Sequence, residues 1–267
     1  MSGAAIAAAI AVAILVAAVV ALRRRAPVWP GAALASIDGD RLMNDVSTLL
    51  DDTARWRPVM HEDGIAVFAG RVPGCPCLAY KSVVDLPASI DAVVRLIADE
   101  MFERLGDWNR QYVGGDVLRV LEEGPGRKAW LMRVFYATAP GLAGREYLYY
   151  LARRALPDGR VVIPYLSVDD PSLKPREGFV RGALHPTVHR CTAIAPGVTR
   201  LEHVLATDLG GSFPPWVQSR LLAGSLAKAT AADARSQRRL FATPSVQTAR
   251  TPARAIRDGT ARVDRRR

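Results

Sequence analysis

The spacing of apolar residues changes along the chain from a helical period to a strand period and back. Leu42, Val46 and Leu49 recur on one side of a predicted helix near the start of the folded region. We expect this helix to have Asp40 as its cap and to end near Trp56. Beyond it, apolar and polar residues alternate, which is typical of strands that bury one face.

A second helix and a long series of strands follow. The helix is expected to open at Pro87, to present an apolar face from Ile90 to Met101, and to be followed by a short turn at 106–109. Helices before and after one run of antiparallel strands predict an α+β fold. Turn signals such as Pro73-Gly74 separate most strands, which are expected at residues 65–72, 77–85, 112–121, 128–137, 145–156, 160–168, 178–185, 188–195 and 200–208.

The junction at residues 208–216 joins the last strand to a long helix. Gly210 and Gly211 allow a sharp turn where a Cβ atom would clash, and Ser212 is a suitable N-cap. Apolar residues then recur at a helical period, so one helix is expected to run to about Leu240. A helix of this length with one apolar stripe needs a surface on which to lie.

Two of the strands carry large polar and aromatic residues at alternate positions. If the sheet curves around the final helix, these side chains point into an internal cavity, where each would need a partner or a ligand. An outward, solvated face is the alternative, because alternation alone does not tell which face is inside. The residues are Arg145, Tyr147 and Tyr149 on one strand and Phe179, Arg181 and His185 on the other.

Residues 4–22 form an uninterrupted apolar run. At about 1.5 Å per residue, the run is about as long as the hydrocarbon layer of a bilayer is thick. Three arginines follow at 23–25, so we expect an uncleaved single-pass membrane anchor, with the residues after it in the cytoplasm. A signal peptide cut near 33–35 and a peripheral helix are the alternatives.

The formal charge of +10 is concentrated at the two ends of the chain. Residues 23–25 carry +3 and residues 235–267 carry +8, so that −1 remains for residues 26–234. We expect no nucleic-acid binding by the folded part, because its charges nearly balance. The tail at 242–267 is rich in Arg, Ser, Thr and Pro, which predicts disorder and attraction to anionic lipid, with RNA as the alternative.

The sequence favours a protein that is not an enzyme and that has no cofactor. Cys75 and Cys77 lack further ligands at zinc spacing, so no metal is expected. The chain contains neither a nucleophile elbow nor a phosphate-binding loop. The alternative is a cavity enzyme, hydrolase-like or cyclase-like, that uses Asp107, Arg181 and His185.

Several segments occur in the order and at the spacing of one family of lipid-binding domains. They are Asp63–Val67, Leu78–Val83, Gly106–Asn109, Gly144–Tyr149, Gly178–Arg181 and Asp208–Trp216. From residue 38 to about 241 the chain therefore resembles the START domain, the steroidogenic-acute-regulatory-related lipid-transfer family. The resemblance implies a helix-grip fold, in which a curved antiparallel sheet surrounds the C-terminal helix and leaves a tunnel for one hydrophobic ligand.

The resemblance also implies ligand-binding residues. Asp107 and Asn109 lie in a segment that is near the tunnel in relatives, so they are candidates for contact with a head group. Tyr147 matches an aromatic residue that helps to cage choline in phosphatidylcholine-binding relatives. His185 stands where those relatives have a second tyrosine, which departs from the choline pattern. Tyr149 shares the face of Tyr147 and is a further candidate.

The sequence also predicts an entrance to the tunnel and a site for an anionic group. The loop at 138–144 resembles the family's lid, and Trp216 at the start of the last helix would lie beside it. Arg133 and Arg181 are candidates to bind a phosphate or carboxylate, because a guanidinium binds such groups in a bidentate manner; surface ion pairing is the alternative. The candidate lid residues are Pro140, Gly141 and Leu142.

These features together predict a membrane-anchored domain that takes up one phospholipid, sterol or similar amphiphile and transfers or presents it at a membrane. Each CH₂ group exposed to water costs about 0.8 kcal/mol, so a closed apolar tunnel would remove most of the cost of moving a lipid. A lipid-gated sensor or scaffold that never releases its ligand is the alternative. The predicted parts are an anchor at 4–22, a linker at 23–37, the START domain at 38–241 and the tail at 242–267.

Overall fold

The computed structural model describes residues 31–138, 142–211 and 215–243, with only the backbone at 215–224. The expected anchor at 4–22 and almost all of the basic tail therefore lie outside the described residues. Within the described ranges, no helix is both long enough and apolar enough to span a bilayer.

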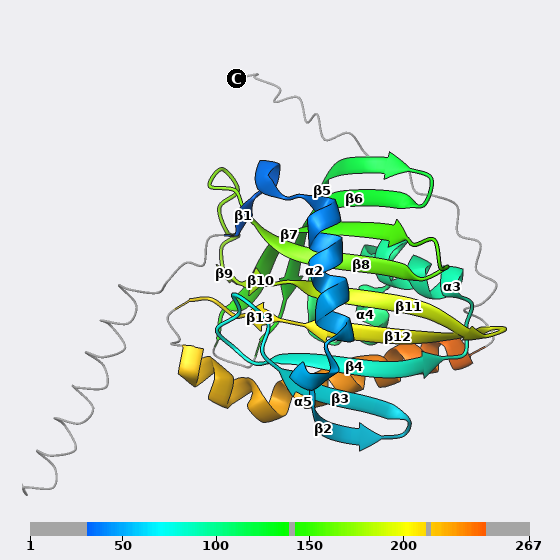
Figure 1. The fold of residues 1–267 in the computed structure, drawn as a ribbon. Helices are drawn as coiled ribbons and strands as arrows, with labels where there is room; N and C mark the ends of the chain where they lie inside the picture. Colours follow the sequence, from blue (N-terminus) through cyan, green and yellow to red (C-terminus); the bar gives the residue numbers. More distant parts are fainter. Residues whose placement is uncertain (1–30, 139–141, 212–214, 244–267) are drawn as a thin grey trace, which may run out of the picture.

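One large antiparallel sheet forms the centre of the fold (Figure 1). The main strands lie in the order β2, β3, β4, β12, β11, β8, β7, β6, β5, and the short strands β1 and β9 pair in parallel with β8 and β7. Strand β10 pairs separately with β13. The bounds are β1 Ala32–Ala33, β2 Arg57–Glu62, β3 Ile65–Gly70, β4 Ala79–Leu86, β5 Tyr112–Gly124, β6 Arg127–Tyr136, β7 Gly144–Ala155, β8 Val161–Asp169, β9 Phe179–Arg181, β10 Ala183–Leu184, β11 Thr187–Ala195, β12 Val198–Leu205 and β13 Thr207–Asp208.

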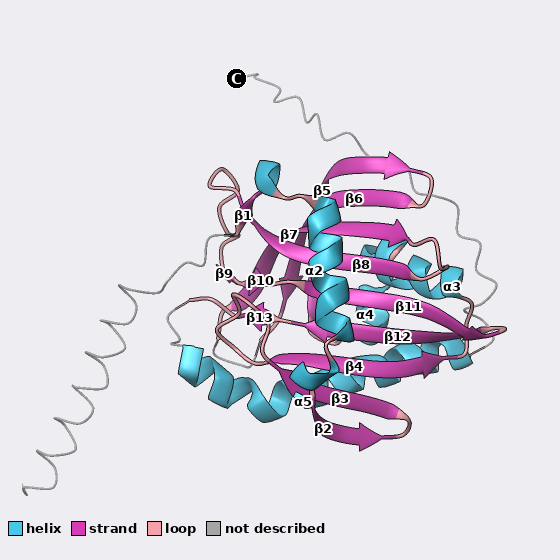
Figure 2. Ribbon diagram, viewed as in Figure 1, coloured by secondary structure: helices cyan, strands magenta, loops and turns pink. Residues whose placement is uncertain are grey.

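Helices cover both faces of this sheet (Figure 2). Helix α2 crosses one face, and α3, α4 and the long helix α5 lie on the other (Figure 1). Helix α5 packs against β3, β4 and α4. The predicted α+β fold with a long C-terminal helix is confirmed. The helical segments are η1 Leu34–Ser36, α2 Gly39–Asp51, η2 Thr53–Arg55, α3 Ile90–Val94, the π-helical η3 Arg95–Asp99, α4 Met101–Trp108 and α5 Pro215–Ala242.

Strand β7 shows how alternation divides the interior into two cores. Leu148 and Tyr150 belong to the core beneath α2, whereas Tyr147, Tyr149 and Leu151 belong to the core on the α5 side. Both sets are buried because successive side chains of a strand point to opposite faces and each face has a helical cover. Strand β7 is therefore buried along nearly its whole length.

The first helix begins and ends earlier than predicted. Its cap is Asp38, not Asp40, because the Asp38 carboxylate accepts hydrogen bonds from the backbone N–H groups of Asp40 and Arg41, both at 3.0 Å. The helix ends at Asp51. Trp56 lies beyond it with its indole buried, donating to the carbonyl oxygen of Leu49.

The second helix is interrupted rather than continuous. It begins at Ile90 with Ser89 as its cap, not at Pro87, because the Ser89 hydroxyl accepts from the backbone N–H of Ala92. A π-helical turn follows, and a new helix, α4, then continues through residues 106–108. Of the turn expected at 106–109, residues 106–108 are therefore helical and only Asn109 lies outside the helix.

The described part of the expected linker is attached to the sheet. Ala32 and Ala33 pair with β8, and Leu34 and Ile37 pack against the core beneath α2. The described residues from 32 onward are therefore part of the folded domain.

The junction before α5 matches its prediction where it is described. Gly210 and Gly211 have φ angles of 63° and 77°, a conformation that favours glycine. Ser212 lies outside the described residues. Helix α5 runs to Ala242, close to the predicted end at Leu240.

Candidate functional site

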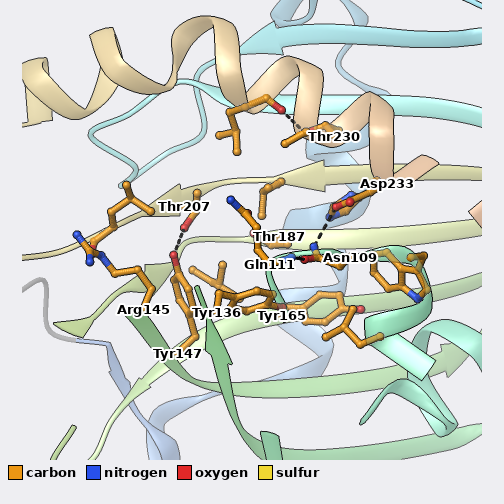
Figure 3. Close-up of a pocket in the computed structure, with 18 of the residues that line it drawn as sticks. Asn109, Gln111, Tyr136, Arg145, Tyr147, Tyr165, Thr187, Thr207, Thr230 and Asp233 are labelled. Carbon is orange, nitrogen blue, oxygen red and sulfur yellow. Dashed lines mark hydrogen bonds between the residues drawn. The ribbon is translucent and has the colours of Figure 1, made fainter. Parts of the chain in front are cut away.

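A cavity of about 490 Å³ lies between the sheet and helix α5 (Figure 3). Ile97, Met101 and Leu105 repeat every four residues, so they project from one side of η3 and α4 into this space. Leu226 and Ala229 line it from α5. Most of the wall is hydrocarbon or aromatic, as in a site for an apolar ligand. The cavity expected between the sheet and the final helix is therefore present.

The alternating row on β7 faces into the cavity. Arg145, Tyr147 and Tyr149 all line it, whereas the residues between them face the opposite side of the sheet. Residues i, i+2 and i+4 of a strand share one face, and here that face lies beneath α5. Of the two orientations that the sequence allows, the structure shows the inward one for this strand.

Arg145 places a positive charge in the cavity wall. Only 4% of the residue is exposed, and its guanidinium donates to the carbonyl oxygens of Leu209 at 2.6 Å and Ala143 at 2.5 Å. Burial lowers the pKa of Arg145, and the nearby Tyr147 and Asp208 act in the opposite direction. A guanidinium has five N–H groups, so these bonds leave further donors for a ligand.

The two tyrosines of this row are deeply buried. The Tyr147 hydroxyl lies 3.0 Å from the hydroxyl of Thr207, and its ring packs edge-on against Tyr136. Burial raises the pKa of both Tyr147 and Tyr149, so their phenols are neutral at physiological pH. Figure 3 shows Arg145, Tyr147 and Thr207 gathered at one end of the cavity.

A carboxyl–amide pair lies at the other end of the cavity (Figure 3). The Asn109 amide donates to the Asp233 carboxyl group of α5 at 3.1 Å. Burial raises the pKa of Asp233 to about 7, although the bond from Asn109 acts in the opposite direction. The structure thus places Asn109 in the cavity wall, and Asp233 carries a proton over most of the acidic range.

A buried histidine cluster forms another polar part of the wall. His189 and His203 are directly opposite each other on β11 and β12, and their rings stack with centroids 4.0 Å apart. The Nδ1 atom of His189 lies 2.8 Å from the hydroxyl of Tyr165. Burial lowers the pKa of His189 well below its usual value and that of His203 to about 4. Both rings are therefore neutral at physiological pH.

Several predicted residues do not line the cavity. Asp107 is exposed on α4 and forms an ion pair with Arg104. Arg133 and Arg181 point to the other side of the sheet, where their Nη2 atoms lie 3.1 Å and 2.6 Å from the carboxylate oxygens of Glu146, which is fully buried.

The strand pairing explains the position of these two arginines. Strand β9 lies parallel to β7 and places Arg181 opposite Glu146, and Arg133 approaches from β6. Glu146 also accepts from the backbone N–H of Arg176. Both arginines are therefore ion-paired, but with a buried glutamate and not at the surface as the alternative expected. His185 is buried, but it too is absent from the cavity lining.

The predicted entrance is described only in part. Leu142 lines the cavity and is 46% exposed, and the hydroxyl of Thr138 donates to the carbonyl oxygen of Ala143. Pro140 and Gly141 lie outside the described residues, as does the side chain of Trp216. Leu142 is therefore the lid residue that the structure places against the cavity.

Sequence reasoning missed several polar residues of the wall, among them Asp233, His189, His203 and Thr207. Asp233 interrupts the apolar stripe of α5 at a spacing of seven from Leu226, which is a signal that could have identified it. His189, His203 and Thr207 show no such signal, because a polar residue within a strand looks the same on either face. Within the described ranges, no three His, Cys, Asp or Glu side chains gather closely enough to hold a metal ion.

Comparison with known proteins identifies similar chains. The family model described as START domain matches residues 42–238. An uncharacterized protein of Pseudomonas aeruginosa is 24% identical over 186 residues, which cover 70% of this chain and 83% of that protein.

Solved structures share the fold. Human StAR-related lipid transfer protein 5 has a TM-score of 0.65 and 19% identity, covering 76% of this chain and 96% of its own. A STAR-related lipid transfer protein fragment from Xanthomonas axonopodis has a TM-score of 0.57 and 18% identity, covering 71% and 99%.

Proposed function

The chain belongs to the START domain family, and on that basis we propose that it binds one amphiphilic lipid in the cavity and transfers or presents it at a membrane. The observation that carries the proposal is the cavity of about 490 Å³ beneath α5, with its largely apolar wall. This volume lies within the range of about 300–1,000 Å³ that is usual for small-molecule sites. The name of human StAR-related lipid transfer protein 5 supports a lipid as the ligand class.

The energetic benefit of such a cavity is large. Sheltering a methylene group from water is worth about 0.8 kcal/mol, so a lipid with about ten enclosed methylene groups gains about 8 kcal/mol. A ligand of this kind leaves a membrane slowly when it must cross water alone. A protein that receives the lipid's hydrocarbon chains directly from the bilayer removes most of the free-energy barrier to leaving the membrane.

The polar end of the lipid belongs at the Arg145 end of the cavity in this proposal. The guanidinium there is held by backbone carbonyl oxygens, and an anionic or strongly polar head group would be a better partner in so apolar a setting. Tyr147 and Thr207 supply hydroxyl groups beside it. Leu142, which is exposed at the lid, would cover this end.

We also propose that the domain is held at a membrane. The apolar run at 4–22, followed by the arginines at 23–25, would hold the domain at the cytoplasmic side of a membrane. The basic tail would add attraction to anionic lipid, at about 1 kcal/mol for each residue near the surface. Both features would keep the cavity close to the bilayer from which it takes its ligand.

A substitution that fills the cavity tests the proposal. Ala229→Trp places a large ring in the cavity from α5, and Ala232→Trp places the same ring on the exposed side of that helix. The assay is uptake of a fluorescent fatty acid or sterol by the full chain in proteoliposomes. We expect the apparent Kd to rise at least about tenfold with Ala229→Trp and to stay unchanged with Ala232→Trp.

The same preparation separates transfer from sensing. Movement of the fluorescent lipid from donor to acceptor vesicles, faster than without protein, supports transfer. Tight retention supports the sensor alternative. Equal uptake by both variants, or no uptake by the wild-type protein, would contradict binding in the cavity. Urea unfolding of each variant shows that it is folded.

A further inference from the structure

Asp233 places a carboxyl group in the wall of a cavity that is otherwise largely apolar. It follows Leu226 by seven residues, or about two turns of α5, so both side chains lie on the side of the helix that lines the cavity. Among the described residues of the wall, Asp233 is the only one with a carboxyl group. Figure 3 shows it at the end of the cavity away from Arg145.

The protein itself does little to stabilise this carboxyl group. Within the described part of the chain, the Asn109 amide is its hydrogen-bond partner, at 3.1 Å, and it takes part in no ion pair. Burial raises the pKa of Asp233 to about 7, and no neighbouring cation opposes that shift. An apolar residue at this position of the helix would avoid the cost of burying the carboxyl group. A polar group kept at such a cost in the wall of a ligand cavity indicates contact with the ligand.

Asn109 determines which oxygen of the carboxyl group is available. The Oδ1 atom of Asn109 accepts from the backbone N–H of Gln111 at 3.0 Å, so the amide turns its nitrogen toward α5. That nitrogen donates to Oδ2 of Asp233. The Oδ1 atom of Asp233 has no hydrogen-bond partner among the described residues, and the side chain is only half-buried. Oδ1 is therefore the atom that a ligand in the cavity can reach.

A hydroxyl group is the partner that suits this carboxyl group in both of its protonation states. The ionised form only accepts hydrogen bonds, and the neutral form can also donate one. A hydroxyl group donates and accepts, whereas a keto oxygen suits only the neutral form and an ammonium group only the ionised form. A hydrocarbon chain would exclude water from the carboxyl group without supplying a hydrogen bond, at a cost of about 1–3 kcal/mol.

We propose that Asp233, positioned by Asn109, binds a hydroxyl group on the apolar body of the ligand, remote from its head group. The inference rests on the proposed lipid-binding function and narrows its ligand class. With the head group at Arg145, the preferred ligand is an amphiphile with polar groups at two places, such as a hydroxy fatty acid. The hydrocarbon stretch between them lies along the apolar wall.

Matched ligands test this inference. The probes are octadecanoic acid and a series of hydroxyoctadecanoic acids in which the hydroxyl group is moved along the chain to its far end. The full wild-type chain should bind at least one hydroxy acid about tenfold more tightly than octadecanoic acid. With Asp233→Leu that preference should disappear, because the hydroxyl group of the ligand would then meet only hydrocarbon at this position.

Two further variants separate hydrogen bonding from charge. Asp233→Asn keeps a donor and an acceptor on the side chain but not the charge, so it should retain a preference of at least about threefold. Asp107→Leu is the matched control, because it makes the same substitution at an exposed carboxylate outside the cavity. It should keep the wild-type preference for the hydroxy acid. Urea unfolding shows that each variant is folded.

The results have distinct meanings. Equal binding of all the acids by the wild-type protein, or an unchanged preference in Asp233→Leu, would overturn the hydroxyl site while leaving lipid binding intact. Loss of the preference in Asp233→Asn would also overturn it, because charge and not hydrogen bonding would then select the ligand. The same loss in Asp107→Leu would show that the preference does not arise at Asp233. Failure of the wild-type protein to bind any of these acids would count against both the inference and the proposed function.

Discussion

Replacing Asp233 by asparagine is expected to stabilise the protein above neutral pH and to change it much less in acid. Burial raises the pKa of Asp233 from 3.8 to about 7, so between these values the native state holds a proton that the unfolded chain releases. The stability that this proton contributes is complete below the unfolded value and is lost as the pH rises through about 7. The asparagine side chain would not titrate, and its amide oxygen would still accept from Asn109.

The size of the effect follows from the pKa. Each tenfold change in proton affinity is worth about 1.4 kcal/mol, so the full effect corresponds to about 4 kcal/mol at about pH 8. Roughly a third of this is already lost at about pH 5. Because the side chain is only half-buried, solvent reduces the effect, and the advantage of Asp233→Asn should grow by about 1–3 kcal/mol between these two pH values.

Urea unfolding of the wild-type protein and the variant at both pH values measures this growth. When the two proteins are compared at the same pH, the contributions of the other titrating groups to the free energy of unfolding cancel. Asp107→Asn is the control, because that exposed carboxylate is outside the cavity and its ion pair with Arg104 is worth at most about 1 kcal/mol. An advantage of Asp233→Asn that is the same at both pH values would refute the reasoning.

Three further predictions concern the fold, and each is measured by urea unfolding. Because Asp38 caps α2, Asp38→Ala should lower the free energy of unfolding by about 1 kcal/mol and Asp40→Ala by less than about 0.5 kcal/mol. A larger loss with Asp40→Ala would indicate that Asp40 is the cap. Glu146→Ala should cost about 3–5 kcal/mol, because it leaves two arginines without their buried partner; a loss below about 1 kcal/mol would contradict this. Gly210→Ala should cost more than Gly159→Ala, since both have positive φ but only at residue 210 would a Cβ atom meet backbone; equal losses would be inconsistent with that contact.

The elements with a strong apolar period could be predicted from the sequence. The helix over Leu42, Val46 and Leu49 is present, and so is the long helix to residue 242, because a repeated apolar face is a local property. Strand β2 could not be predicted in this way. It is exposed along almost its whole length and is held by pairing with β3, so its side chains show no alternation.

Local boundaries depended on single hydrogen bonds. Asp38 and Asp40 are equally suitable caps by residue type, and only the backbone geometry shows which carboxylate accepts from the first turn. In the same way, residues 106–108 contain Gly and Asp, which favour a turn, yet they continue α4 because Leu105 and Trp108 are buried in the core. Tertiary packing here outweighs local propensity.

The order of apolar segments and the motifs along the chain were sufficient to identify the START resemblance, the α+β class and an internal cavity. Three of the candidate residues, Asn109, Tyr147 and Tyr149, line this cavity. The roles of Arg133 and Arg181 were decided only by the fold, because parallel pairing of β9 with β7 brings a buried glutamate between them. Likewise, His189, His203 and Asp233 become cavity residues only when strands and helix distant in sequence come together, since alternation defines two faces and the tertiary structure determines which one is inside.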